Sequence, residues 1–445
     1  MAKILTKNKI DTISLIEKLL NEDLQVDGGK IEENVVKKLL IKRDLFIKLS
    51  KRYRTPFYIF DREQFIENIH HLHEGLKKYI PDIHMFYAMK LNNHRFFINE
   101  ALKSGMGLDV ASPKELLTAI KFGCNNILYF CPGKSLEDLH LALKYRDRIT
   151  VNIDSFSELK KLGELTNNNK EEVKVGIRIF TSKQGLWSKY GIPLEGLSEF
   201  WIMTKQKYPH IRLQGIHFHT SRNKDATLYV DTIAQIGKYL KKNFSDEMLE
   251  KVKYVDFGGG YEQQDSEGIF PYELPQGKII KTVSDYFNLN IKFIDRYYVR
   301  VALDIDDYAR NIGKAIDKYF RPIIKAKYYT EPGRYLCTNA MHILLTIADV
   351  KSEKVAIANG GVSMVGWQRF QHEYFPLINL TNPSMTEKEI NIFGKLCTTW
   401  DLWGYYCYMK NIMEGDLILV PNQGALTYSI AQDWIFSIPQ VYKLE

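Results

Sequence analysis

The sequence predicts a parallel (β/α)8 TIM barrel that is preceded by a helical extension and followed by a C-terminal β-rich domain. From about residue 53, short apolar runs alternate with longer amphipathic stretches, which is the rhythm of successive βα units. Eight such units fit before residue 332, the number that closes a barrel. After residue 332 the pattern changes mostly to strands, so the predicted domains are 1–52, 53–331 and 332–445.

Each predicted barrel strand is a short apolar run, and each is followed by a segment long enough for a crossover helix. These strands are 83–90, 106–110, 126–131, 148–153, 173–179, 213–219, 252–257 and 327–331. Two connections, 181–210 and 258–326, are long. Long loops in such a barrel usually belong to the face that carries the active site, so we expect these two segments there.

The regions on either side of the barrel are read from their periodicity. Residues 1–52 look helical, with a break at Asp27-Gly28-Gly29, and we interpret them as a packing appendage rather than a partner-binding element. The apolar positions at helical spacing in the second half are Val35, Leu39, Phe46 and Leu49. The predicted C-terminal strands are 341–350, 354–358, 391–398, 416–421 and 434–438. Segment 53–60 also reads as a strand, and it joins either the barrel or the β-domain.

Composition excludes several classes of protein. Of the 445 residues, 45% are hydrophobic and 26% are charged, the balance of a folded globular chain. The net charge of +8 is scattered, so we expect no nucleic-acid partner. No apolar run approaches the roughly 20 residues of a membrane span, and the N-terminus has no signal-peptide core. The five cysteines form no Cys-x-x-Cys pair, and their odd number argues against a disulfide framework. We expect a cytoplasmic protein without a membrane partner.

The chemistry lies where the predicted barrel strands end, which is where such barrels place catalytic groups. The first strand ends in Lys90, the sixth in His219, the seventh in Gly258-Gly259-Gly260 and the eighth in Glu331. Pro-Gly-Arg334 follows the last of these. Taken singly, each has a plain explanation: a surface lysine, a core histidine, a tight turn. Together they provide an amine, a flat ring, a glycine-rich phosphate cradle and a carboxylate–arginine pair at one rim.

Pyridoxal 5′-phosphate (PLP) requires those groups, and we expect no metal. Its aldehyde reacts with a lysine amine, and its phosphate takes glycine-rich backbone and arginine. A carboxylate beside the pyridine nitrogen keeps that nitrogen protonated, which makes the ring a strong electron sink. Glu331 would fill that position, and Lys90 would hold the cofactor as a Schiff base.

The order of the motifs resembles the fold-type III PLP decarboxylases, the ornithine, diaminopimelate and arginine decarboxylase family, whose fold is alanine-racemase-like. The matching segments are Phe86-Tyr-Ala-Met-Lys90-Leu-Asn, Gly107-Leu-Asp-Val-Ala-Ser-Pro-Lys-Glu115-Leu, Gly133-Lys-Ser135, Asn152-Ile-Asp154-Ser155, Ser188-Lys-Tyr-Gly191, His217-Phe-His219, Asp256-Phe-Gly-Gly-Gly260, Glu331-Pro-Gly-Arg334, Gly394-Lys-Leu-Cys397-Thr-Thr-Trp-Asp401 and Gly424-Ala-Leu-Thr-Tyr428-Ser. They cover about residues 53–435. Many ordered motifs are far more specific than any one of them.

The resemblance implies a role for each matching residue. Lys90 would be the Schiff-base lysine, Glu331 the partner of the pyridine nitrogen, and Cys397 the group that protonates Cα, donated by the second subunit of a homodimer. The implied cofactor-binding residues are Lys90, His219, Ser221, Gly258, Gly259, Gly260, Glu331, Gly333, Arg334 and Tyr428. The implied substrate-binding residues are Arg369, Thr398 and Asp401.

The departures from the family pattern concern the phosphate and the substrate. The family's His-x-Gly-Ser becomes His219-Thr220-Ser221-Arg222, so its phosphate-binding serine is displaced or replaced. Leu426 stands where the family has a phosphate-contacting tyrosine, and Tyr428 is the substitute we consider. After Cys397, Thr398 replaces the acid that recognises a distal amine. Asn359-Gly360-Gly361 also replaces the usual Asp-Ala-Gly.

We therefore predict a PLP-dependent decarboxylase that acts on an α-amino acid as a homodimer. The loss of the distal-amine acid points to a specialised substrate, such as an intermediate of siderophore or peptide-antibiotic synthesis. A racemase of the same fold is one alternative. The resemblance implies that such a racemase pairs an arginine with the pyridine nitrogen, and Glu331 at that position argues against it. A non-catalytic PLP-binding or regulatory protein and an antizyme-inhibitor-like partner are the others. The intact Lys90, Glu331 and Cys397 argue against the first of these, and the second would not need the retained cofactor residues.

Overall fold

The computed structural model describes residues 14, 28–181, 189–221, 223–263, 268–269, 275–288, 298–299, 302–366, 373–384, 386–404 and 407–445. They fall into two compact units. The barrel unit holds the described residues of 63–262 and 302–337. The β-unit holds those of 1–62, 263–301 and 338–445.

The barrel unit is built on eight parallel strands, as predicted. They are β2 (Ile83–Ala88), β3 (Gly107–Val110), β4 (Ile127–Tyr129), β5 (Ile149–Ile153), β6 (Val173–Phe180), β8 (Ile211–His217), β9 (Tyr254–Asp256) and β12 (Lys327–Thr330). Their order is β5-β4-β3-β2-β12-β9-β8-β6, and β5 pairs with β6 to close the barrel. Each predicted strand coincides with one of these within a few residues, because continuous apolar runs are typical of strands buried on both faces.

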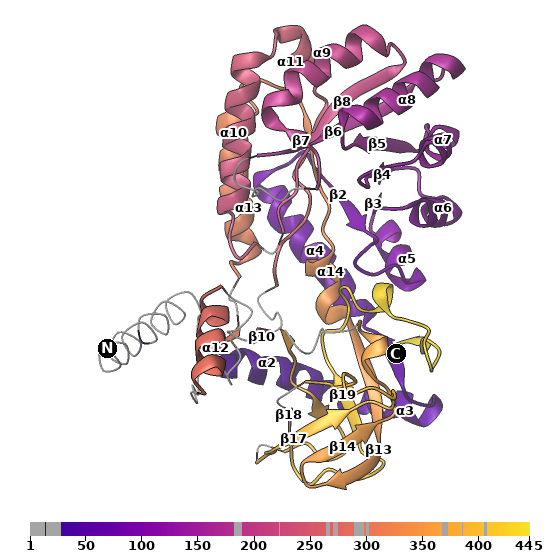
Figure 1. The fold of residues 1–445 in the computed structure, drawn as a ribbon, viewed down its shortest axis with the longest axis vertical. Coiled ribbons are helices and arrows are strands. Elements are labelled where there is room, and N and C mark those ends of the chain that lie inside the picture. The colour runs from indigo at the N-terminus through magenta and orange to yellow at the C-terminus, as the bar shows by residue number, and fades with distance from the viewer. Residues whose placement is uncertain are drawn as a thin grey trace. The chain divides into compact units, whose positions relative to one another are not determined.

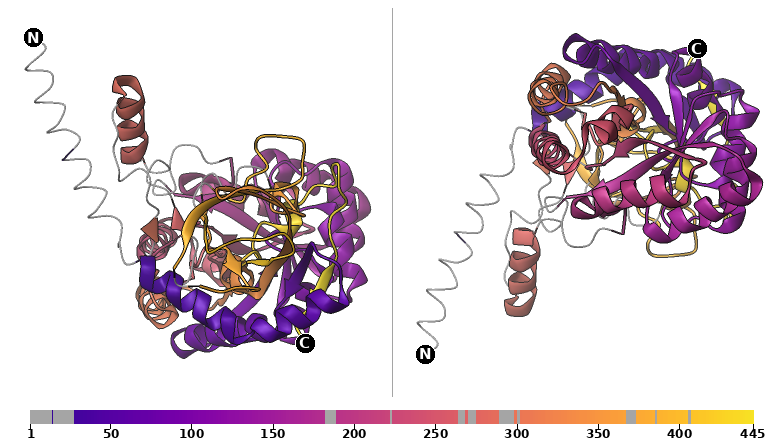
Figure 2. Two further views of the ribbon diagram at one scale, coloured as in Figure 1. Left: turned by 90° about the horizontal axis from the view of Figure 1, so that it is seen from below. Right: turned by 90° about the horizontal axis from the view of Figure 1, so that it is seen from above.

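Helices form the outer layer around these strands, as Figure 2 shows for α5 to α8. The principal helices are α4 (Arg62–Tyr79), α5 (Arg95–Lys103), α6 (Pro113–Lys121), α7 (Leu136–Lys144), α8 (Phe156–Asn169), α9 (Leu197–Lys207), α10 (Thr227–Asn243), α11 (Asp246–Lys251) and α13 (Ile305–Tyr319). Local sequence determines where several begin. Ser112, Ser135 and Ser155 each accept a backbone N–H three residues ahead, which satisfies a donor left free in the first turn.

The β-unit is organised around the long strand β13 (Met341–Ser352), visible in Figure 1 beside β14, β17 and β19. The sheet order is β16-β19-β13-β14-β17-β18, and β1 pairs with both β13 and β20. β13 itself pairs with β1, β14 and β19. The other strands of this sheet are β1 (Phe57–Phe60), β14 (Val355–Ala358), β16 (Ile378–Asn379), β17 (Lys388–Phe393), β18 (Cys407–Met409), β19 (Leu417–Val420) and β20 (Val441–Lys443). The strand predicted at 53–60, which corresponds to β1, thus belongs to this sheet and not to the barrel.

Two of the predicted C-terminal strands are wrong in part. Strand 391–398 ends at Phe393, because the chain turns at Gly394 into the loop that carries Cys397. Segment 434–438 forms only an isolated bridge between Trp434 and Phe436. The connection 258–326 also contributes short elements that were not predicted: β10 (Gly268–Ile269), α12 (Pro275–Phe287) and β11 (Tyr298–Val299), with β10 pairing β11 and β15 (Glu373–Tyr374).

The compact units do not follow the predicted boundaries. Residues 53–62 group with the β-unit, since β1 is hydrogen-bonded to β13 and β20. Residues 332–337 group with the barrel, and the described part of 263–301 groups with the β-unit although it lies inside the predicted barrel sequence. Because the β-unit is assembled from segments that are far apart in the chain, no change in the sequence pattern shows where one unit ends and the other begins.

The described part of the N-terminal extension packs inside the β-unit. It consists of α2 (Gly28–Ile41) and α3 (Arg43–Arg52), and α2 begins within the predicted break, at Gly28. The four predicted core positions, Val35, Leu39, Phe46 and Leu49, are buried in one cluster with Phe57, Ile59, Leu344, Ile378, Leu380 and Leu419. No helix among the described residues is long and apolar enough to cross a membrane.

Candidate active site

The predicted catalytic groups of the barrel unit gather at the carboxyl ends of neighbouring strands. Lys90 comes two residues after β2, and Glu331 directly after β12, the strand that pairs with β2. His219 follows β8 and Gly258 follows β9, which pairs with both β8 and β12. Parallel strands end at the same rim, so the fold brings these residues together.

Lys90 is held by a buried carboxylate on the next strand. Its Nζ atom donates to Oδ2 of Asp109 on β3 at 3.0 Å. The Lys90 side chain is 39% exposed, whereas that of Asp109 is 1% exposed. Burial lowers the pKa of Lys90, but the charge and hydrogen bond of Asp109 act in the opposite direction, and the pKa lies above its ordinary value. The amine is therefore accessible, and in the cofactor-free protein it is an ammonium ion.

The Gly258-Gly259-Gly260 turn lets the chain approach its neighbours closely. Gly258 has φ +67°, and a Cβ there would lie 2.2 Å from Nδ1 of His219. A Cβ at Gly260, φ +101°, would lie 2.1 Å from the Thr220 carbonyl oxygen. Only glycine adopts this conformation without strain or collision.

Two of the three glycine N–H groups already have protein partners. Gly258 donates to Oδ1 of Asp256 at 2.9 Å, and Gly259 donates to Nδ1 of His219 at 3.1 Å. The N–H of Gly260 has no partner among the described residues. The turn therefore offers an anion the N–H of Gly260, while its other two glycines position Asp256 and His219.

His219 is a neutral ring with a defined tautomer. Because its Nδ1 accepts the Gly259 N–H, its proton lies on Nε2. Burial, with the charges of Arg178 and Lys90, lowers its pKa well below the ordinary range. The ring is partly exposed, as a group that stacks on a cofactor must be.

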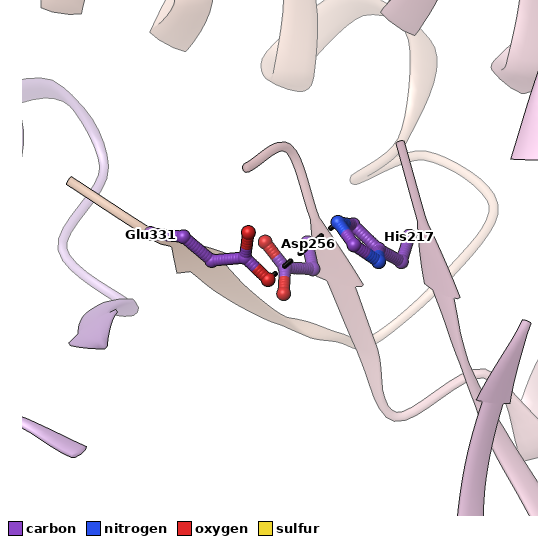
Figure 3. Close-up of side chains that lie close together, drawn as sticks. All are labelled: His217, Asp256 and Glu331. Atoms are coloured by element: carbon purple, nitrogen blue, oxygen red, sulfur yellow. Dashed lines mark ion pairs between the residues drawn. The ribbon is translucent and has the colours of Figure 1, made fainter. Parts of the chain in front are cut away.

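Behind these residues lies a buried cluster of His217, Asp256 and Glu331, drawn in Figure 3. One ligand-type atom from each lies within 4.8 Å of the others. His217 Nε2 lies 3.5 Å from Oε1 of Glu331 and accepts a hydrogen bond from Nη1 of Arg178 at 3.0 Å. Burial, together with the charge of Arg178, lowers the pKa of His217 well below its ordinary value, so the ring is neutral. An arginine thus supplies the positive charge that a metal ion would bring.

The remaining predicted residues of the barrel unit lie around this group. Gly333 lies against Leu91, since a Cβ at position 333 would be 2.5 Å from the Leu91 Cγ atom. The loop after Lys90 and the Pro-Gly segment after Glu331 are thereby packed together. Arg334 is half-buried at the start of α14 (Arg334–Cys337), and Ser221 is exposed directly after the buried Thr220.

The predicted residues of the β-unit lie on loops. Cys397 is an exposed free thiol, and Thr398 beside it is half-buried. Asp401 is buried, and its two carboxylate oxygens accept the N–H groups of Val362 and Leu396, each at 2.7 Å. This carboxylate holds the loop in place, and its contact with the substrate stays a prediction. The Tyr428 ring packs edge-on against Tyr58, with 5.3 Å between centroids. Arg369 lies outside the described residues.

Comparison with known proteins identifies the family. The model of the family described as "Pyridoxal-dependent decarboxylase, pyridoxal binding domain" matches residues 66–338. The chain belongs to the pyridoxal-dependent decarboxylases. It is 24% identical to the diaminopimelate decarboxylase of Methanothermobacter thermautotrophicus, over 91% of this chain and 90% of that protein. It is 26% identical to the L-glutamyl-[BtrI acyl-carrier protein] decarboxylase of Niallia circulans, over 86% of each.

The fold agrees with solved decarboxylases. The diaminopimelate decarboxylase from M. jannaschii, in co-complex with L-lysine, superposes with a TM-score of 0.73 at 21% identity, covering 89% of each chain. The predicted family, fold class, cofactor and decarboxylase activity are thereby confirmed. Nothing in the comparisons favours the racemase alternative.

The residues of this decarboxylase fit PLP. The partly exposed Lys90 amine, the Gly260 N–H and the ring face of His219 supply a covalent anchor, a phosphate donor and a stacking surface. Oε1 of Glu331 is buried without a hydrogen-bond partner among the described residues, which leaves an oxygen for the pyridine nitrogen. The donor set is that of a PLP site rather than a metal site.

Four site residues were not assigned roles from the sequence: Asp109, Arg178, His217 and Asp256. Asp109, His217 and Asp256 lie inside quoted motifs, in Gly-Leu-Asp-Val, His-Phe-His and Asp-Phe-Gly-Gly-Gly, so their signal was present. Arg178 lies on β6 outside any quoted motif, with its guanidinium 4.7 Å from the Phe130 ring centroid. Only the closed barrel brings these four residues together.

Proposed function

We propose that the enzyme removes the α-carboxylate of an amino acid as carbon dioxide, with the reaction centred on Lys90 and Glu331. The observation that carries the proposal is that these two residues end the paired strands β2 and β12, with the Lys90 amine accessible and the Glu331 carboxyl buried. An amine and a carboxyl so placed match the two ends of one pyridoxal ring.

When bound, PLP supplies the electron sink that takes up the electron pair left by the departing carboxylate. The protein provides the rest. Lys90 would hold the cofactor covalently and release the product, while Glu331 would keep the ring nitrogen protonated. His219 would stack on the ring. The thiol of Cys397 returns a proton to Cα, and Lys90 is the alternative donor.

The chemistry of the loop supports a substrate without a distal amine. Thr398, next to the exposed thiol of Cys397, carries no charge and cannot pair with an ammonium group. The relative from Niallia circulans is named for a glutamyl group attached to a carrier protein, which also lacks a free side-chain amine. We infer a specialised amino-acid substrate whose far end is neutral or anionic.

We infer further that the enzyme works as a homodimer in which Cys397 serves the site of the partner subunit, and that it resides in the cytoplasm. An exposed thiol on a loop suits donation across a two-fold interface. All five cysteines are free, as in a reducing compartment.

The test is a labelling and turnover experiment on purified protein. Borohydride reduction of the holoenzyme should fix the cofactor on the peptide that contains Lys90. Carbon dioxide release should then be measured over a panel of amino acids with basic, neutral and acidic side chains. Labelling of another lysine would refute the assignment of Lys90, and racemisation without carbon dioxide release would refute decarboxylation.

A further inference from the structure

The buried pair of Asp256 and Glu331 has unsatisfied oxygens that the proposed function does not use. Oδ2 of Asp256 and Oε1 of Glu331 are both buried and have no hydrogen-bond partner among the described residues. The two side chains are 0% and 3% exposed and lie within one 4.8 Å cluster (Figure 3). Two buried carboxylates this close cannot both remain ionised without strong repulsion.

We propose that Asp256 and Glu331 share one proton in the cofactor-free protein, so that Glu331 meets the ring nitrogen of PLP as an acid rather than an anion. Asp256 is then a positioning residue whose negative charge keeps Glu331 protonated. The inference rests on the proposed function for the pairing of Glu331 with the ring nitrogen, but its first half concerns the protein alone.

The histidines facing Glu331 offer it no proton. His217 turns Nε2 toward Oε1 at 3.5 Å, and that nitrogen is the acceptor of the Arg178 N–H. His219 turns Nδ1 toward Oε2 at 3.9 Å, and that nitrogen is the acceptor of the Gly259 N–H. Each of these nitrogens uses its lone pair for its own N–H donor and carries no proton, so neither ring stabilises the Glu331 anion by a hydrogen bond, which favours the neutral acid.

The charges around the pair support one bound proton. The groups that interact electrostatically with it are Lys90, Asp109, Arg178, His217, His219 and the phenols of Tyr254, Tyr261 and Tyr329. The histidines and phenols are neutral, so Lys90 and Arg178 provide two positive charges against three carboxylates. Asp154 beside Arg178 adds a further negative charge. A proton on the pair reduces the excess of negative charge in a buried site.

The proton belongs mainly to Glu331. Oδ1 of Asp256 accepts the Gly258 N–H at 2.9 Å, which stabilises the anion of Asp256, whereas Oε1 of Glu331 has no donor among the described residues. Burial raises the pKa of Asp256 to about 7, and burial with the charges of Asp109 and Asp256 raises the pKa of Glu331 well above its ordinary value. When the cofactor binds, the O–H bond of Glu331 breaks, a bond from that proton to the ring nitrogen forms, and the carboxylate remains paired with it.

The first test is infrared spectroscopy of the cofactor-free protein at mildly alkaline pH, above the ordinary pKa of a carboxyl group. Wild type should show the carbonyl band of a protonated carboxylic acid. Glu331→Gln should lose it, and so should Asp256→Asn, because removing one negative charge lets Glu331 ionise. Asp416→Asn is the matched control, a buried carboxylate of the β-unit that accepts from Asn379 and Met413, and it should keep the band.

No band in wild type, or a band that persists in either site variant, would overturn the shared proton. Circular dichroism establishes that each variant is folded. A pH titration of wild type labelled with carbon-13 in its carboxyl groups answers the same question without a variant. Two carboxyl groups should titrate in a coupled way: one should ionise at the lower pH, and the other should still be protonated at mildly alkaline pH.

The second test separates the inference from the proposed function. Proton uptake on PLP binding is measured in weakly buffered solution with a pH indicator. Asp256→Asn should take up about one proton more per bound cofactor than wild type, because its Glu331 no longer supplies the ring-nitrogen proton. If wild type and Asp256→Asn take up equal numbers of protons while the infrared result holds, the shared proton is supported but its transfer to the ring nitrogen is refuted. If the purified wild-type protein contained one equivalent of a divalent cation that His217→Ala lacks, both the shared proton and its transfer would be refuted.

Discussion

The Nζ atom of Lys90 lies 3.0 Å from Oδ2 of Asp109, a carboxylate on the neighbouring strand that is almost fully buried. In this contact Lys90, the residue proposed to react with the cofactor, is paired with the negative charge of Asp109. Asp109 raises the pKa of Lys90 against the opposing effect of burial. The contact therefore governs the pH at which the free amine becomes available.

Asp109→Asn should shift PLP incorporation toward lower pH. Removing the carboxylate lowers the pKa of Lys90, so that the neutral amine exists at a lower pH than in wild type. The measurement is the rate at which the cofactor-free protein recovers its cofactor absorbance, taken as a function of pH. Asp416→Asn should leave the profile in place. A profile that does not move, or moves upward, would contradict the role of Asp109.

Gly258→Ala should abolish cofactor binding while the chain still folds. The new Cβ would lie 2.2 Å from Nδ1 of His219, at φ +67°, and would displace the ring and the turn. Gly123→Ala is the matched control, because Gly123 has φ +79° but nothing within 4 Å of an added Cβ. The control carries similar backbone strain of order 1 kcal/mol without the collision. Equal PLP affinities in the two variants would show that the close approach at Gly258 is not required.

Glu331→Gln should retain PLP but lose turnover by about two to three orders of magnitude, the range seen when one preorganised charge-stabilising group is removed. Glutamine keeps the shape of the side chain but cannot carry the negative charge that pairs with a protonated ring nitrogen. The absorbance spectrum and the rate of carbon dioxide release together test this. Glu331→Asp keeps the charge and should be less impaired. Undiminished turnover in the glutamine variant would show that another group serves the ring.

The barrel was predictable because its signal is local. Each strand is a continuous apolar run buried on both faces, and the strand ends carry residue types that stand out singly, such as Lys90 and the triple glycine. Whether 53–60 joins the barrel or the β-domain could not be decided from the sequence, since β1 pairs with residues about 280 positions away.

The partners behind the site were less predictable for a similar reason. Arg178 and His217 lie on strands β6 and β8, and neither residue differs in type from an ordinary buried ion or core ring. Only the register of the closed barrel shows that Arg178 donates to His217 and that His217 faces Glu331. Asp401 adds a structural role that its motif position did not indicate, because its two oxygens accept backbone N–H groups of Val362 and Leu396.

Wild-type enzyme should turn over ornithine, lysine and meso-diaminopimelate poorly, because Thr398 offers no charge to a distal ammonium. Thr398→Asp should raise kcat/KM for these amines by roughly 10- to 100-fold, the worth of one charge-assisted hydrogen bond. Thr399→Asp, at the exposed next position, is the control and should give no gain. Efficient wild-type turnover of any of the three would mean that another carboxylate has taken over the task.

The last prediction concerns Cys397 and the second subunit. Lys90→Ala and Cys397→Ala should each be nearly inactive alone, since one removes the anchor and the other the proton donor. If Cys397 crosses a two-fold interface, a mixed dimer carries one doubly damaged site and one intact site. If Cys397 serves its own chain, every site in every dimer carries one lesion.

Co-expression of the two variants distinguishes these cases. Random pairing makes half of the dimers mixed, and half of their sites are intact, so activity should return to about a quarter of the wild-type value. The assay is carbon dioxide release from any substrate that the panel identifies, with subunit exchange verified by differently tagged chains. Mixing Lys90→Ala with Glu331→Gln is the control, because both residues belong to the barrel unit and no site in that mixture is whole. No recovery for the Lys90 and Cys397 pair, despite proven exchange, would place Cys397 in the site of its own chain or outside the reaction.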